Sequence, residues 1–226
     1  MPTAPAGLTW PPPQGGLTVL RPRRTAPPPP TEDRPLTPYS LAFYVDAVRT
    51  GTVLGLRPSD SPGRVADVMG TDFAENRAGK RAMFRDYGLA EFHWQRAAAG
   101  DPWSGHHFSL QVHRLVHGDR TAPGEVLGAR YGRFAPRLPF EKLRRLLDRR
   151  GVPLVEIPEP AANAPRFRTF WQPGSLTAVH FIGARDPHRA PGELRVGDVY
   201  RIEAPVTAQQ VAWREERARG RGTGGR

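Results

Sequence analysis

Two stretches of the chain share one pattern, and this repetition constrains the fold more than any other feature. Residues 83–96 (MFRDYGLAEFHWQR) and 169–183 (TFWQPGSLTAVHFIG) are each two short, apolar-rich runs around a glycine, which is typical of an antiparallel hairpin. Aligning the two glycines, with one inserted residue, pairs His93 with His180. Each hairpin follows a helical pattern that ends in glycine and precedes a further strand-like run. This order predicts two related halves, each a helix on a small antiparallel sheet.

Three segments carry the signals of helix ends, with a polar cap or a proline at the start and a glycine at the end. They are residues 37–51, 61–70 and 138–151. The first has Thr37 as its expected N-cap and apolar residues at helical spacing. A final amphipathic turn or two is expected within residues 207–220.

Alternation of apolar and polar residues predicts the strands. They are expected at 80–86, 89–96, 107–116, 126–131, 152–157, 166–172, 176–182 and 199–203. The fold class is therefore α+β, two helix-on-antiparallel-sheet halves flanked by disordered tails, with a duplicated unit as one interpretation. Whether the halves share one sheet is left open.

Composition sets the expected boundaries. Residues 1–37 hold 11 of the 26 prolines and few apolar residues, so they predict a disordered proline-rich arm. A helix-helix-three-strand module (38–118), a linker with one strand (119–138), a helix-plus-strands module (139–213) and an Arg/Gly-rich disordered tail (214–226) follow.

Cysteine usage and charge limit the function. The chain has no cysteine, which excludes disulfides, zinc-thiolate sites and thiol nucleophiles, and it shows neither a signal peptide nor a long apolar run. We expect a cytoplasmic protein that is not associated with membranes. The net charge of +11 suits nucleic acid, yet residues 38–213 carry 24 basic and 18 acidic side chains without a dense cluster. Nucleic-acid binding is kept as the alternative function.

Catalytic motifs are absent: the chain has no G-x-S-x-G, no P-loop and no dinucleotide-binding fingerprint in a strand–helix context. On a strand, His113 and His117 would lie about 13 Å apart at 3.3 Å per residue, too far to chelate one ion. His93 could pair with His113 if the register allowed. We expect no catalytic residues, no metal ligands and no cofactor, and keep a metal-dependent enzyme as the third possibility.

A protein interface fits the remaining residues best. Tryptophan, phenylalanine and arginine are enriched at interface anchors, and the arginines suit an acidic partner. The candidate binding residues are Arg85, Trp94, Arg96, Trp103, Phe108, Arg114, Arg168 and Trp171.

The first half also resembles known bacterial modules. The signature LGLRPSDSPGRVADVMG, followed by FRDYGLAEFHW and FSLQVHRL, is similar to the helix-helix-three-strand modules of outer-membrane-assembly lipoproteins and of immunity proteins in polymorphic toxin systems. The resemblance covers roughly residues 53–116. It departs from the lipoproteins because a signal peptide and a lipid-bearing cysteine are missing. It implies a non-enzymatic protein that binds a cognate toxin domain and blocks it by covering it, with the partner's identity and the oligomeric state left open.

Overall fold

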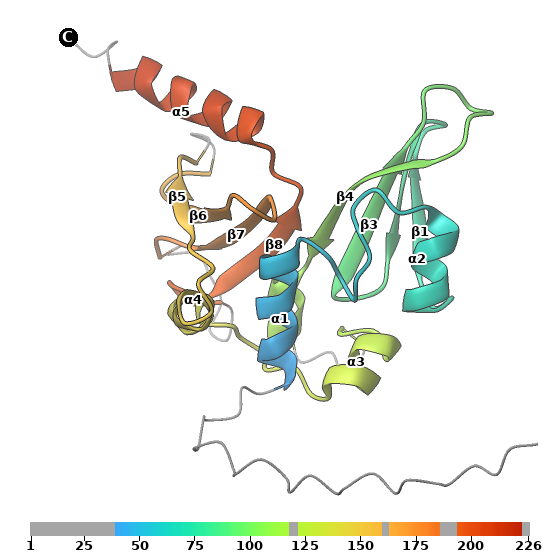
Figure 1. Cartoon of the computed structure of the whole chain (residues 1–226), viewed down its shortest axis with the longest axis horizontal. Coiled ribbons are helices and arrows are strands. Elements are labelled where there is room, and N and C mark those ends of the chain that lie inside the picture. Colours follow the sequence, from blue (N-terminus) through green and yellow to red (C-terminus); the bar gives the residue numbers. More distant parts are fainter. Residues whose placement is uncertain (1–38, 118–121, 160–162, 186–193, 223–226) are drawn as a thin grey trace, which may run out of the picture. The chain divides into compact units, whose positions relative to one another are not determined.

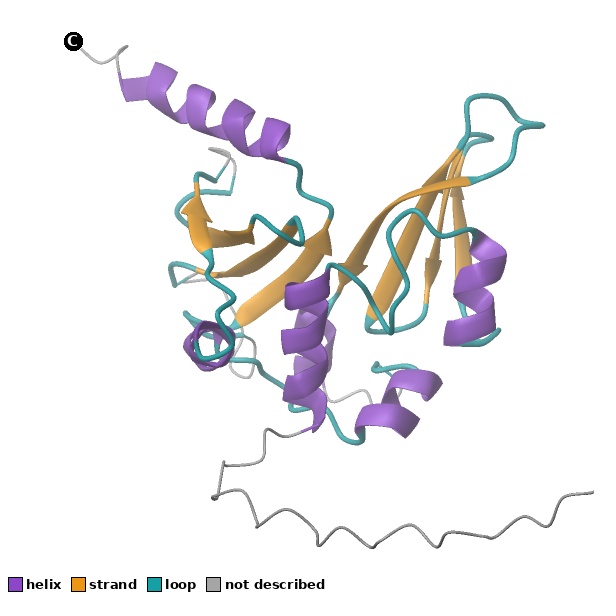
Figure 2. Cartoon of the chain, viewed as in Figure 1, coloured by secondary structure: helices purple, strands orange, loops and turns teal. Residues whose placement is uncertain are grey.

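The structure is a computed structural model that describes residues 39–117, 122–159, 163–185 and 194–222. The predicted proline-rich arm, the Thr37 cap and the last four residues of the predicted tail lie outside these ranges. The described part is α+β, as the sequence predicts, with helices and one antiparallel sheet (Figures 1 and 2).

The helices are α1 (Tyr39–Thr50), α2 (Pro62–Met69), α3 (Glu125–Tyr131), α4 (Phe140–Asp148) and α5 (Ala208–Gly222), with a 3₁₀ helix η1 (Val112–His117). The strands are β1 (Ala74–Ala78), β2 (Ala82–Asp86), β3 (Ala90–Gln95), β4 (Ser104–Leu110), β5 (Val155–Ile157), β6 (Phe167–Gln172), β7 (Thr177–Ile182) and β8 (Val199–Ala204).

The two halves form one continuous sheet, which answers the question that the sequence leaves open. Its strand order is β1-β2-β3-β4-β8-β7-β6-β5. Each half is a four-stranded meander, and the last strands of the two meanders, β4 and β8, pair antiparallel. We call this β4–β8 ladder the seam.

The register relates the two halves by an approximate two-fold axis. At the seam, Ser109 faces Glu203 in the central pair. Phe108 faces Ala204 on one side of it, and Leu110 faces Ile202 on the other. Within each half, the register between the third and fourth strands shifts by a β-bulge directly after the matched histidine. The shift lies between His93 and Trp94 in the first half and between His180 and Phe181 in the second. The shared β-bulge supports the duplication predicted from the hairpins.

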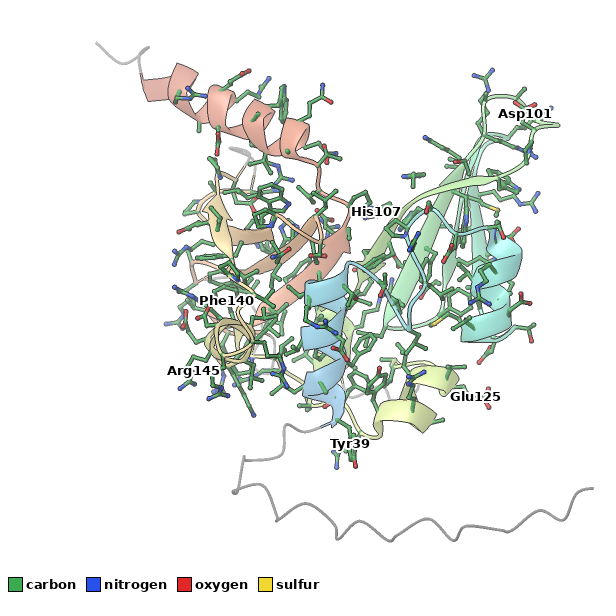
Figure 3. All side chains as sticks on the ribbon, viewed as in Figure 1. Tyr39, Asp101, His107, Glu125, Phe140 and Arg145 are labelled. Carbon is green, nitrogen blue, oxygen red and sulfur yellow. The ribbon has the colours of Figure 1, made fainter. Side chains whose placement is uncertain are left out.

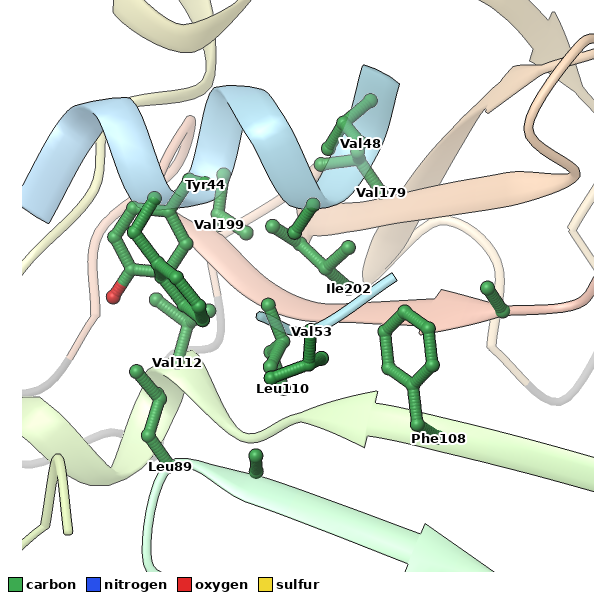
Figure 4. Packing of buried hydrophobic residues seen from close by; sticks show 14 of the residues in the cluster. Tyr44, Val48, Val53, Leu89, Phe108, Leu110, Val112, Val179, Val199 and Ile202 are labelled. Atoms are coloured by element: carbon green, nitrogen blue, oxygen red, sulfur yellow. The ribbon is translucent and has the colours of Figure 1, made fainter. Parts of the chain in front are cut away.

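One face of the sheet carries the main core. Phe108, Leu110, Val179 and Ile202 are buried on this face, and Figure 4 shows Val48 of α1 above the seam residues. The inward residues of α2, α3 and α4 join the same cluster. A smaller cluster, of Ile157, Ala178, Val206 and Val211, lies under α5.

The cap signals locate the helix ends well. In α2, Ser61 accepts a hydrogen bond from the Arg64 N–H at 3.2 Å, and Pro62 is the first helical residue. The Gly70 N–H closes the helix on the Ala66 carbonyl, with φ of 85°, a conformation that glycine adopts without strain.

The structure differs from the sequence predictions at four places. Residues 126–131 belong to the helix α3 and do not form a strand. Only Leu127 is fully buried there, whereas a half-buried strand would bury every second residue. The strand expected to reach residue 116 ends at Leu110 and continues as η1. The edge strand β1 was missed because all five of its residues are exposed. The helix α5 extends to Gly222, into the segment assigned to a disordered tail.

Candidate functional site

A band of buried polar side chains crosses the face of the sheet opposite the main core. Charged residues are seldom buried unless they are paired, so this band is the candidate functional site. It alternates along the strands with core residues, as Glu91 does with Phe92 and Glu203 with Ile202. The polar band consists of Glu91, Ser109, Gln111, Thr169, His180 and Glu203.

Arg114 holds the first-half end of the band together. Its guanidinium donates to both carboxylate oxygens of Asp86 and to the Gly88 carbonyl, each at 2.8 Å, and forms an ion pair with Glu91. Gln111 also donates to Glu91, at 2.7 Å. Burial alone would raise the pKa of Glu91, but contacts with His93, Arg114 and Gln111 hold it at about 2.

His180 holds the second-half end. Its Nε2 lies 2.9 Å from Glu203 Oε1, and its Nδ1 lies 2.6 Å from Thr169 Oγ1 and 3.5 Å from Glu159 Oε1. Burial alone would lower the pKa of His180, but the two carboxylates outweigh it and raise the pKa. His180 and Arg201, in turn, overcome the effect of burial on Glu203 and hold its pKa at about 2.

Three histidines lie beside the band where the first-half bulge brings them together. The register places His93 opposite His107 and leaves His106 as the extra residue of β4. The ring centroids of His93 lie 5.3 Å from those of His107 and 6.4 Å from those of His106. Burial lowers the pKa of His107 to about 4, and burial with the nearby His93 lowers that of His106. Figure 3 labels His107 on β4.

The sequence suggested His113 as a partner for His93, but the structure places His107 opposite His93. His113 lies in η1, where its ring stacks on Tyr200 with centroids 4.4 Å apart. Across the residues that the structure describes, no three histidine, aspartate or glutamate side chains are arranged to hold a metal ion.

One contact set has the composition of a nucleophile with its base. Thr169, His180 and Glu203 form a hydroxyl–imidazole–carboxylate chain, the arrangement that activates a serine or threonine in hydrolases. Thr169 is fully buried, and its hydroxyl also contacts Glu159. A substrate cannot reach that hydroxyl in this conformation, so the chain of contacts acts here as a structural ion network.

Two of the predicted interface residues belong to the core, which corrects their assignment. Trp94 and Phe108 are 1% and 0% exposed, since both lie on the core face of the sheet. The Trp94 indole N–H donates to the Asp60 carbonyl at 2.8 Å. These two side chains position the sheet and cannot contact a partner directly.

Of the other six predicted residues, four belong to the first half and two to the second, and Arg96 and Trp103 contact each other. Arg85 donates to Glu75 and to the Pro62 carbonyl, and Arg114 belongs to the polar band. Arg96 lies over the Trp103 ring at 4.2 Å, on the first half. On the second half, Arg168 pairs with Glu156, and the Trp171 indole N–H donates to the Val206 carbonyl. Their role in binding stays a prediction.

Sequence reasoning overlooked most of the polar band. Ser109, Thr169 and Glu203 were not singled out, although one signal was present. Ser109 and Glu203 each lie between two apolar residues along the chain, a position that turns the polar side chain away from the main core. Thr169 follows Arg168 and gives no such signal.

The described helices include none long and apolar enough to cross a membrane. Comparisons with models of protein families, with curated proteins and with solved structures find no match, so the proposals below rest on the residues alone.

Proposed function

We propose that this chain is a non-enzymatic binding protein of the immunity type, acting in the cytoplasm by covering a partner toxin domain. The observation that carries the proposal is the internal pairing of the polar band. Glu91, Glu203 and His180 are each buried and bound to other side chains of the band or beside it. Groups used in this way stabilise the sheet and are not available as general acids, bases or nucleophiles.

Charge supports a partner with an acidic surface. Among side chains that the structure describes, the first half (39–117) has 9 basic and 8 acidic groups. The second half, from residue 122 to 219, has 16 basic and 9 acidic groups, a net of +7. Complementary potentials guide association and set specificity, so the net charge of the second half would attract an acidic toxin domain.

The test is coexpression with the products of adjacent genes. We expect one neighbouring product to be toxic alone, harmless when this chain is present, and copurified with it in a defined ratio. If protection requires no physical complex, or if the purified chain degrades or modifies the product, the binding proposal is wrong.

Nucleic-acid binding is a second candidate because part of α4 is basic and unpaired. Arg144 lies 3.8 Å from Glu141 and 3.9 Å from Asp148, whereas Lys142 and the adjacent Arg149 form no ion pair with another described residue. Cations near a helix C-terminus also suit the helix dipole, which explains Arg149 without a ligand. Retention of labelled DNA and RNA at low salt tests this candidate, since phosphate contacts weaken steeply with added salt. Absence of retention at low salt excludes it.

A further inference from the structure

The approximate two-fold is broken directly after the fourth strand of each half. Gln111 N–H donates to the Leu89 carbonyl, and Val206 N–H donates to the Leu176 carbonyl, both at 2.7 Å. Leu89 and Leu176 are matched residues of the two hairpins. Beyond these bonds the paths separate: the first half forms η1, and the second half continues into α5.

In the first half, η1 fills the space beside the start of β8. It packs against that strand, and His113 stacks on Tyr200 at an interplanar angle of 10°. Tyr200 is the extra residue of the β8 bulge, because His180 faces Arg201 while Phe181 faces Val199. The matched residue of β4 is His106.

No such segment fills the matched place beside the start of β4, within the described chain. A pocket of about 410 Å³ lies there instead. We call it the seam pocket; its lining includes Thr52, Arg57, Ser59, His106, Leu176 and Pro205. Its volume falls in the range of sites that accept small ligands or side chains.

The walls of the seam pocket are joined closely. A Cβ on Gly51 would lie 2.5 Å from the Ser175 carbonyl oxygen, and one on Gly105 would lie 2.4 Å from that of Pro58. Ser175 also donates to the Val48 carbonyl at 2.5 Å. These contacts tie the end of α1 to the β6–β7 turn, and the 57–59 loop to β4. The walls of the pocket are therefore held in place before a ligand arrives.

We propose that the seam pocket binds an aromatic side chain from an acidic segment of the partner, stacked on His106. The matched place shows the contact, in which one planar ring lies flat on another. Arg57 forms no ion pair with another described residue, and its exposed position at the pocket suits a carboxylate next to the ring. Thr52 and Ser59 offer hydroxyls to a phenol, which makes tyrosine the best fit. Burial and the nearby His93 lower the pKa of His106, which favours the neutral ring.

The identity of the occupant rests on the proposed function, but the pocket can be tested without a partner. The probe is N-acetyl-tyrosine, which carries a phenol and a carboxylate, titrated into the full chain and followed by NMR. We expect its addition to shift the His106 ring and Leu176 methyl signals. N-acetyl-leucine, which has the carboxylate and no ring, is the matched probe and should bind more weakly.

Variants locate the site. His106→Ala should weaken N-acetyl-tyrosine binding roughly three- to tenfold, the loss that one ring contact typically causes, and Arg57→Gln should weaken it as well. His117→Ala, at an exposed histidine of η1, is the control and should change nothing. Equal binding of both probes, absence of shifts at His106 and Leu176, or unchanged affinity in His106→Ala would each overturn the proposal. Failure to find a toxin partner would contradict the proposed function and leave this result intact.

Discussion

Ser109 and Glu203 face each other across the seam, and the approximate two-fold passes through this pair. The two residues are therefore matched positions, with a hydroxyl in one half and a carboxylate in the other. The first half obtains its buried carboxylate from β3 instead, where Glu91 lies opposite Ser109. Each half thus places one acidic group beside the axis and neutralises it with its own cation, Arg114 or His180.

Replacing His180 should destabilise the protein far more than replacing His93, the matched residue of the first half. His180→Gln removes the cation that lies between Glu159 and Glu203 and leaves Glu203 with Arg201 alone. Breaking a buried pair typically costs about 3–5 kcal/mol. His93 lies nearer the surface and approaches Glu91 only at 3.7 Å, so His93→Gln should cost less than about 1 kcal/mol. Urea denaturation of both variants measures the difference. Equal losses would show that the two histidines have the same role.

Acid should destabilise the fold through His107. Its folded pKa is about 4, below the unfolded value of about 6.5. Between these values the unfolded chain binds more protons, so stability falls as the pH is lowered, by up to about 1.4 kcal/mol per pH unit. The depressed pKa of Glu203 adds a further loss below its unfolded value of 4.5.

The variant His107→Asn tests that assignment because asparagine does not titrate. We expect the dependence of unfolding free energy on pH to flatten in the window between the two His107 pKa values. The loss at lower pH, which comes from the carboxylates, should remain. If the variant keeps the full slope in the upper window, another group is responsible.

Local signals in the sequence predict several helices and strands correctly, but they do not predict which distant strands pair with each other. Ser61, Pro62 and Gly70 place α2 correctly because caps act within one helical turn. The seam depends on Leu110 meeting Ile202, and nothing near either residue encodes that choice. The duplicated hairpins predicted the halves, but joining them edge to edge is a property of the folded sheet.

The site was harder to predict for a related reason. A glutamate in a strand usually indicates a solvated face, and Glu203 gives no local sign that His180 and Arg201 will enclose it. Trp94 and Phe108 illustrate the converse, since residue types that favour interfaces also favour cores. Only the register shows on which face each side chain lies.

Substituting alanine for Gly105, in the wall of the seam pocket, should reduce stability more than the same change at Gly100, outside the pocket. Gly105→Ala would place a Cβ 2.4 Å from the Pro58 oxygen and 2.7 Å from the Asp60 oxygen, both backbone atoms. Forcing them apart should cost about 1–3 kcal/mol. Gly100→Ala meets nothing within 4 Å and should be neutral, or stabilising by up to about 1 kcal/mol. Thermal unfolding distinguishes the two; a harmless Gly105→Ala would contradict the close packing described for the walls.

Two tryptophans separate packing from partner binding. Trp103→Ala removes a partly buried ring that Arg96 covers, and we expect weaker partner binding, by roughly tenfold or more, with a small change in stability. Trp94→Phe keeps an aromatic ring in the core, smaller than the indole, and removes the hydrogen bond to the Asp60 carbonyl. It should cost about 1–2 kcal/mol and leave affinity unchanged at temperatures where the variant is folded. Titration calorimetry with the copurified partner, alongside urea denaturation, compares both quantities. Unchanged affinity in Trp103→Ala would place the binding surface elsewhere, and the basic second half would then be the next region to substitute.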